Sequence, residues 1–121
     1  MFEFFKSGKD NANNGSIKIG LEQKEQWLEV IELSNEKPIF IFKHSSRCGI
    51  SSVILSRFEK QIKERDDSYY FLHIQGEREL SNWVAEELEV RHESPQLIVL
   101  KDEKVIAHDS HHALLDIIPK L

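Results

Sequence analysis

Hydrophobic residues follow two different spacings along this chain, and the spacings predict strands and helices in turn. Residues 39–42 and 69–74 are near-continuous apolar runs, a pattern typical of strands that are buried on both faces of a sheet. Between these runs, apolar residues recur every three to four positions from Ile50 to Ile62, which predicts a helix over residues 49–64. The chain therefore predicts a strand–helix–strand unit with a right-handed parallel crossover.

Weaker patterns predict the elements around this unit. In chain order we expect an edge strand at residues 17–19, amphipathic helices over residues 22–34 and about 80–88, strands at residues 97–100 and 105–107 joined by a polar hairpin at residues 101–104, and a short last helix capped by Ser110. This order predicts an α/β fold, with a four- or five-stranded mixed sheet and helices on both faces. Trp27 and Trp83 lie on the apolar stripes of two helices and are expected in the core.

The start of the chain differs from the rest in composition. Residues 7–16 read SGKDNANNGS, which is small, polar and without periodicity, so we expect residues 1–16 to form a flexible N-terminal segment. Residues 17–121 are expected to form one domain, because a chain of this size can build a full core without disulfides. The segment begins with three residues that could dock on the domain or on a partner: Phe2, Phe4 and Phe5.

The charge balance and the apolar runs exclude several classes of partner. The chain has 16 basic and 21 acidic residues, a net charge of −5, and therefore lacks the basic footprint of a general nucleic-acid binder. No apolar run approaches the roughly 20 residues that span a bilayer, so we expect no membrane partner. The apolar stretch from Met1 to Phe5 is too short for a secretory signal. These features predict a cytoplasmic protein.

The single cysteine, Cys48, is the first candidate for chemistry. One cysteine excludes an intramolecular disulfide and a multi-cysteine zinc site within one chain. Cys48 follows a predicted buried strand and directly precedes a predicted helix, where free backbone N–H groups and the helix dipole stabilise a thiolate. We therefore expect a thiol pKa below the ordinary value of about 8.5. The alternative is a buried, inert thiol, which the polar residues beside Cys48 disfavour.

The residues around the cysteine fit a reactive thiol. Gly49 has no side chain and would leave the sulfur open to a bulky disulfide, and the hydroxyl of Ser51 could donate a hydrogen bond to the thiolate. Three basic residues are expected on the same loop, where they could bind the carboxylates of a small thiol: Lys43, His44 and Arg47. A histidine cluster near the end of the chain is expected to be solvated and not to bind a metal: His108, His111 and His112.

Three segments resemble a known family. Residues 42–51, FKHSSRCGIS, resemble the F-K-H-S-x-x-C-P-I-S segment of the YtxJ-like monothiol bacilliredoxins, with Gly49 in place of the family's usual proline. Residues 75–82 and 90–96 are similar to the family's Q-x-x-R-x-x-S-N and V-x-H-x-S-P-Q segments. The resemblance extends from about Ile17 to Ile118.

The resemblance implies a thioredoxin-like fold and a thiol-exchange reaction. Cys48 would attack the mixed disulfide between a client protein and bacillithiol, take up the small thiol, and be regenerated by a second thiol. Ser51 stands where dithiol relatives have a resolving cysteine. The resemblance also implies a cis Ser94–Pro95 bond beside Cys48, with the Ser94 main chain pairing with the substrate. We expect a monomer with bacillithiolated clients, bacillithiol or a similar thiol as co-substrate, and no bound cofactor.

The sequence is also compatible with two other functions. The segment from Cys48 to Ser51 also resembles the C-G-F-S motif of monothiol glutaredoxins, which carry a [2Fe–2S] cluster at a dimer interface. Here Ile50 replaces the phenylalanine, and the chain lacks a Gly-Gly pair after the last strand. The second alternative is a redox-silent binding module that retains only the fold.

Overall fold

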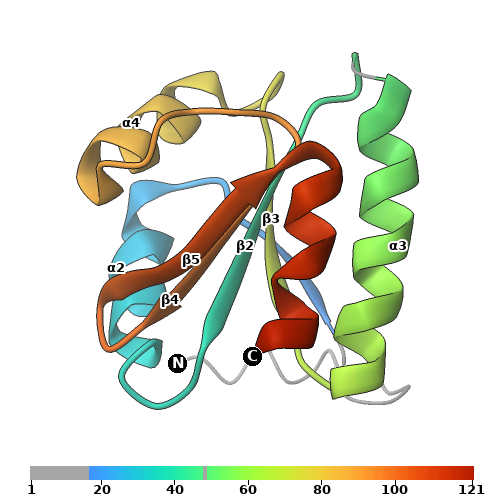
Figure 1. The fold of residues 1–121 in the computed structure, drawn as a ribbon. Helices are drawn as coiled ribbons and strands as arrows, with labels where there is room; N and C mark the ends of the chain where they lie inside the picture. Colours follow the sequence, from blue (N-terminus) through green and yellow to red (C-terminus); the bar gives the residue numbers. More distant parts are fainter. Residues whose placement is uncertain (1–16, 48) are drawn as a thin grey trace.

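The computed structural model describes residues 17–47 and 49–121, and its elements follow the predicted order (Figure 1). The expected flexible segment at residues 1–16, with its phenylalanines, lies outside the described residues. The elements are β1 (Lys18–Gly20), α2 (Lys24–Leu33), β2 (Ile39–His44), α3 (Gly49–Arg65), β3 (Tyr69–His73), α4 (Arg78–Leu88), β4 (Gln96–Lys101), β5 (Lys104–Ser110) and the 3₁₀ helices η2 (His111–Asp116) and η3 (Ile118–Lys120).

The five strands form one mixed sheet in the order β1-β3-β2-β4-β5. β3 pairs in parallel with both β1 and β2, while β4 pairs antiparallel with both β2 and β5. The prediction of a mixed sheet with an edge strand at its start is therefore confirmed. β2 is the central strand, and it has a parallel neighbour on one side and an antiparallel neighbour on the other.

Helices cover both faces of the sheet, as predicted (Figure 1). Successive side chains of a strand point to opposite faces, so Ile39 and Ile41 of β2 pack with α2 and α4, whereas Phe40 and Phe42 pack with α3 and η2. All six residues of β2 are buried. Trp27 is 3% exposed and belongs to the core, as expected. Trp83 is half-buried and packs against this core, and its ring meets that of Trp27 edge-on at 6.0 Å.

Three local expectations are wrong. Leu28 and Val53 lie at helical spacing with the other apolar residues of the helices predicted over residues 22–34 and 49–64, which predicts their burial, but they are 71% and 51% exposed. The interior position beside Trp27 belongs to Val30, which is fully buried. The short last helix is present as the 3₁₀ helix η2, directly after Ser110, but Ser110 makes no side-chain cap to it. Ser110 is the last residue of β5 and pairs with Gln96 of β4, so the strand ladder fixes its position.

Candidate functional site

The site is built at the carboxyl end of β2, where residues 45–47 lead to the start of α3. Cys48 lies outside the described residues, but the residues on both sides of it are described. Gly49 is exposed, and a Cβ added to it would meet no atom within 4 Å. The space at the start of this 17-residue helix is therefore open, which fits the expectation that Gly49 leaves room for a substrate. Arg47 is exposed beside it, as expected for a cation that meets a small acidic ligand.

The amide of Gln75 holds the loop that precedes Cys48. Ser46 N–H donates to Gln75 Oε1 at 3.0 Å, and Gln75 Nε2–H donates to Ser45 Oγ at 2.8 Å. Within the loop, Arg47 N–H donates to the same Ser45 hydroxyl at 3.3 Å. His73 Nε2 lies 3.4 Å from Ser46 Oγ. The end of β3 and the turn after it thus fix the chain path just before the cysteine, and the sequence alone did not predict this role for Gln75.

Ser51 is fully buried and bonds to β2 and its loop. Its Oγ lies 2.9 Å from His44 Nδ1 and accepts the N–H of Ser45 at 3.4 Å. The hydroxyl expected to face a thiolate thus already has a histidine partner. Burial is the main cause of a lowered pKa at His44, and the charges of His73 and Lys18 lower it further. A neutral His44 follows, 8% exposed and stacked beside His73, which corrects the expectation of a charged residue on the loop.

Lys43 also departs from the expectation. Its side chain is fully buried and lies on the opposite face of the sheet from α3, beneath α4. The ammonium donates to the Ser81 carbonyl at 3.2 Å and lies 3.5 Å from His92 Nδ1. Burial lowers the pKa of Lys43 to about 8. Lys43 therefore cannot meet a small thiol in solvent, because strand alternation directs it into the interior.

The segment around Pro95 runs beside the loop that precedes Cys48. The peptide bond between Ser94 and Pro95 is cis. Gln96 pairs with Lys43 in the antiparallel ladder. Pro95 and Ser94 precede Gln96 in the chain and therefore lie alongside the end of β2 and the residues after it. The Pro95 carbonyl accepts the N–H of His111 at 3.0 Å.

Ser94 itself has unused hydrogen-bonding groups. Its Oγ is buried without a partner, and its N–H and C=O make no hydrogen bond within residues 17–47 and 49–121. Buried polar groups are normally paired. This short stretch is therefore the part of the site where an extended peptide could add hydrogen bonds to the backbone.

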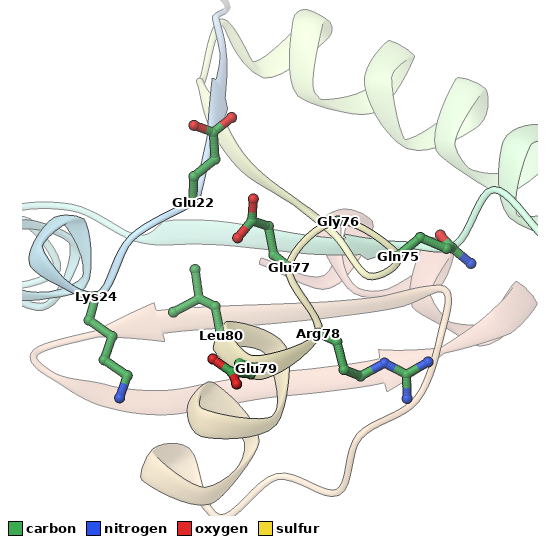
Figure 2. A pocket seen from close by; sticks show the side chains of 8 residues that line it. All are labelled: Glu22, Lys24, Gln75, Gly76, Glu77, Arg78, Glu79 and Leu80. Carbon is green, nitrogen blue, oxygen red and sulfur yellow. The ribbon is translucent and has the colours of Figure 1, made fainter.

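Two adjoining cavities lie on the other side of the loop, at the carboxyl ends of β1 and β3. One, of about 430 Å³, contains His44, Phe71 and His73 in its wall, and the other, of about 400 Å³, contains Lys24 and Arg78. Glu22, Gly76 and Glu77 line both. Figure 2 shows Gln75 pointing away from Glu22, toward the chain that follows β2. The cavity walls thus carry both charge signs beside the loop that Gln75 holds.

No three histidine, aspartate, glutamate or cysteine side chains come together as a metal site in the described part of the chain. His108, His111 and His112 lie at the junction of β5 and η2 and do not form such a group.

Comparisons with known proteins agree on a family and a fold. The sequence model of the family described as "Monothiol bacilliredoxin BrxC" matches residues 19–116. A solved structure of a candidate oxidoreductase with a thioredoxin fold is 31% identical, with a TM-score of 0.76, over 85% of this chain and 91% of its own. Thioredoxin O2 from Arabidopsis thaliana, in its oxidised state, has a TM-score of 0.69 at 17% identity, over 93% of this chain and 98% of its own. The predicted thioredoxin-like fold is confirmed.

Proposed function

This chain belongs to the monothiol bacilliredoxin BrxC family, and from that premise we propose that it removes bacillithiol from protein mixed disulfides through Cys48. The family and the fold make it a thiol oxidoreductase. The choice of bacillithiol as the small thiol, and of bacillithiolated proteins as clients, is our proposal. Bacillithiol would act as a co-substrate that enters and leaves, without a resident cofactor.

The proposed reaction conserves disulfide bonds. The Cys48 thiolate attacks the bacillithiol sulfur of the mixed disulfide, so a Cys48–bacillithiol bond forms while the bond to the client sulfur breaks. The client leaves as a thiolate and takes up a proton. The thiolate of a second small thiol then attacks the bacillithiol sulfur, which produces a free small-molecule disulfide and restores the Cys48 thiolate. The attacking thiol supplies the reducing electrons.

The observation that carries this proposal is the place of Cys48 in the chain, directly before the first residue of α3. Gly49 begins a 17-residue helix, and the first N–H groups of such a helix have no partner within it. Together with the helix dipole they favour an anion at this position. The exposed guanidinium of Arg47 adds positive charge to a chain whose net charge is −5. These features support a thiolate that is available near neutral pH.

The neighbouring residues support the exchange step by holding the chain and receiving the client. Gln75 fixes the loop before Cys48 through three hydrogen bonds. Ser94 offers an unpaired backbone beside that loop, and an extended segment of the client would pair with it. Ser51 replaces the second cysteine of a dithiol enzyme, so the resolving thiol comes from outside the chain.

We propose that the protein acts as a monomer in the cytoplasm. Within the described residues, no helix combines the length and the apolar character needed to cross a membrane. The proposed clients are folded proteins whose modified cysteines lie in accessible segments, because the unpaired stretch at Ser94 suits an extended chain.

The test is transfer of the small thiol onto Cys48. A bacillithiolated client is mixed with equimolar protein, and intact-mass spectrometry follows both chains. We expect the client to lose the mass of bacillithiol and the protein to gain it, while Cys48→Ser gains nothing. A client carrying glutathione, tested in parallel, measures the preference for the small thiol. Equal transfer from both clients would contradict the bacillithiol assignment, and no transfer from either would contradict the reaction.

A further inference from the structure

Beneath α4 lies a buried polar cluster that the exchange reaction does not use. It consists of Lys43 from β2, Ser81 from α4 and His92 from the segment that joins α4 to β4. Lys43 Nζ–H donates to Ser81 O at 3.2 Å and approaches His92 Nδ1 at 3.5 Å, and Ser81 Oγ lies 3.3 Å from the same nitrogen. The cluster therefore joins three separate parts of the fold at one point.

The cation of this cluster lacks a carboxylate partner. Lys43 is 0% exposed, and within residues 17–47 and 49–121 its ammonium makes no ion pair with an aspartate or glutamate. Burial of an unpaired charge is costly, and lysine is among the residues least often fully buried. An apolar residue of similar length would fill this place at lower cost. Stability alone therefore does not explain a lysine here.

The contacts of Lys43 converge on residues 92–96, the segment on which we propose that the client docks. Its backbone pairs with Gln96, directly after Pro95. Its ammonium reaches His92, two residues before Ser94. Lys43 thus contacts both ends of the stretch from His92 to Gln96, and the unpaired backbone of Ser94 lies between these two contacts. Gln96 Nε2–H also donates to the carbonyl of Arg91 at 2.9 Å, which closes the stretch into a compact loop.

We propose that Lys43 is a positioning residue for client docking, which acts by holding His92 and thereby orienting Ser94 toward an extended client. This inference rests on the proposed function, because it assigns Lys43 to the docking step of the same reaction. Lys43 has no part in the chemistry at Cys48. Its removal affects the binding of the client and leaves the reactivity of the thiol unchanged.

The arrangement depends on a neutral His92. Nδ1 must carry a lone pair to accept a hydrogen bond from the ammonium, and a protonated ring would turn an N–H toward it. The groups that act on His92 are Lys43 of β2, Arg78 and Ser81 of α4, and Glu93 of its own segment. Burial and the two cations lower the pKa of His92 below its ordinary 6.5, against the opposing effect of Glu93. The contact is therefore intact at neutral pH and lost in acid.

The first test separates docking from chemistry. In Lys43→Met, a side chain of similar length fills the site without a charge or a donor. We expect the KM for a bacillithiolated client to rise about three- to tenfold, as for the loss of one hydrogen bond of typical net strength, with kcat within twofold of wild type. The alkylation rate of Cys48 should not change. The matched control is Lys101→Met, at the opposite end of β4, which should leave KM unchanged.

A second variant tests the role of His92 and keeps the inference falsifiable if Lys43→Met folds poorly. His92→Asn places an oxygen acceptor near the position of Nδ1 and does not titrate. We expect a KM close to that of wild type at pH 7.5. As the pH falls below 6.5, we expect the KM of wild type to rise and that of His92→Asn to lack this rise. Because Cys48 is present in both proteins, the ratio of their KM values removes the titration of the thiol. An unchanged acid profile in His92→Asn would overturn the inference.

Hydrogen exchange measures the positioning effect without activity. In Lys43→Met, the amide of His111, which donates to the Pro95 carbonyl at 3.0 Å, should exchange faster, while the amides of β3 keep the wild-type rate. Wild-type exchange rates at His111 and in β3, together with an unchanged KM, would overturn the proposal. Faster exchange throughout the sheet would also overturn it, because it indicates a purely structural role. If wild type fails to accept bacillithiol, the proposed function fails, and the exchange data still decide whether Lys43 orders the segment.

Discussion

Two stretches meet at the carboxyl end of β2, and the fold treats their polar groups in opposite ways. Residues 45–47 are held by Gln75, by Ser51 and by a contact within the loop. Ser94, alongside, has a backbone with no hydrogen bond in the described part of the chain. Both stretches are connections between regular elements, and both expose part of their surface. The difference is therefore a property of the side chains that surround them and not of the type of structure.

This contrast separates two requirements of an exchange enzyme. A nucleophile must approach the disulfide in a fixed direction, and polar contacts on the preceding residues supply that rigidity. A client must find groups that are not already paired within the enzyme, and Ser94 supplies those. In our proposal, His92 and Lys43 hold the stretch that contains Ser94, while the backbone of Ser94 stays unpaired within the described residues. The carboxyl end of β2 thus combines a closed loop, residues 45–47, whose polar groups are paired, with an open stretch at Ser94, whose backbone is unpaired within the described residues.

The assignment of residues 45–47 and Ser94 to two steps of thiol exchange would no longer apply if Cys48 held a [2Fe–2S] cluster and did not exchange thiols. A cluster has four ligands, one chain offers one cysteine, and external thiols would need a pocket to hold them. The junction of β5 and η2 has His111 and no glycine pair. We expect anaerobic reconstitution with iron, sulfide and either glutathione or bacillithiol to leave the protein colourless. A brown dimer whose colour is lost in Cys48→Ser would replace the exchange function with cluster transfer.

Loosening the closed loop should have the next largest effect. Gln75→Ala removes the three hydrogen bonds that Gln75 makes to residues 45 and 46. Small displacements of a reacting group can lower rates by up to about 100-fold. We expect kcat for transfer to fall about 10- to 100-fold, with little change in KM for the client. Stopped-flow measurement of client release gives both constants. A raised KM with an unchanged kcat in Gln75→Ala would contradict the view that residues 45–47 serve the reaction step and not client binding.

β2 shows how far the sequence alone could predict this site. The run of apolar residues from Ile39 to Phe42 correctly predicted a buried strand, because periodicity is a local signal. The burial of the next two residues, Lys43 and His44, was not predicted. Lys43 is accommodated by contacts 38 and 49 positions further along the chain, in α4 and before β4. No local pattern shows that such partners will be in place, and lysine is normally exposed.

Gln75 shows a different limit. It falls in a segment that resembles the family, so the sequence marked it without giving it a role. The role depends on β3 lying beside β2 in a parallel register that brings His73 next to His44. The predicted strand–helix–strand unit implied that the two strands are parallel, but not that a side chain after the second would reach the loop after the first.

The buried cation beneath the docking segment should make stability depend on pH. The pKa of Lys43 is lowered to about 8 in the folded state, against 10.5 as the ordinary value. Between these two values the unfolded chain binds more protons than the folded one, so this group increases stability as the pH rises from about 8 to 10.5. Lys43→Met lacks the effect. Its stability relative to wild type should therefore decrease by about 1–3 kcal/mol across this range.

Urea unfolding of both proteins at pH 7, 8, 9 and 10 measures the difference between them. The comparison removes contributions from Tyr69 and Tyr70, whose pKa values are raised by burial in both proteins. A difference that does not change with pH would mean that Lys43 keeps an ordinary pKa. The docking stretch would then be held by a cation with an accessible path to water.

The smallest expected effect concerns Ser51, which lies between the closed loop and the helix. Its single hydroxyl proton has two possible acceptors, the Nδ1 of His44 at 2.9 Å and a thiolate at position 48. If neutral His44 carries its proton on Nδ1, it donates to Ser51 Oγ, and so does the N–H of Ser45. The hydroxyl proton of Ser51 is then free for the thiolate, and this hydrogen bond lowers the thiol pKa. We expect this tautomer to operate, because it leaves both Ser51 and the thiolate hydrogen-bonded.

Ser51→Ala should accordingly raise the midpoint of Cys48 alkylation by about 0.5 to 1 pH unit, the size of one hydrogen bond of typical net strength. The wild-type midpoint should itself lie below about 8.5. Rates of alkylation between pH 5 and 10 give both values. Ser52→Ala is the matched control, because its side chain is exposed on the same turn of α3. Equal midpoints in wild type and Ser51→Ala would place the hydroxyl proton on the bond to His44, so that only the helix start and Arg47 stabilise the thiolate.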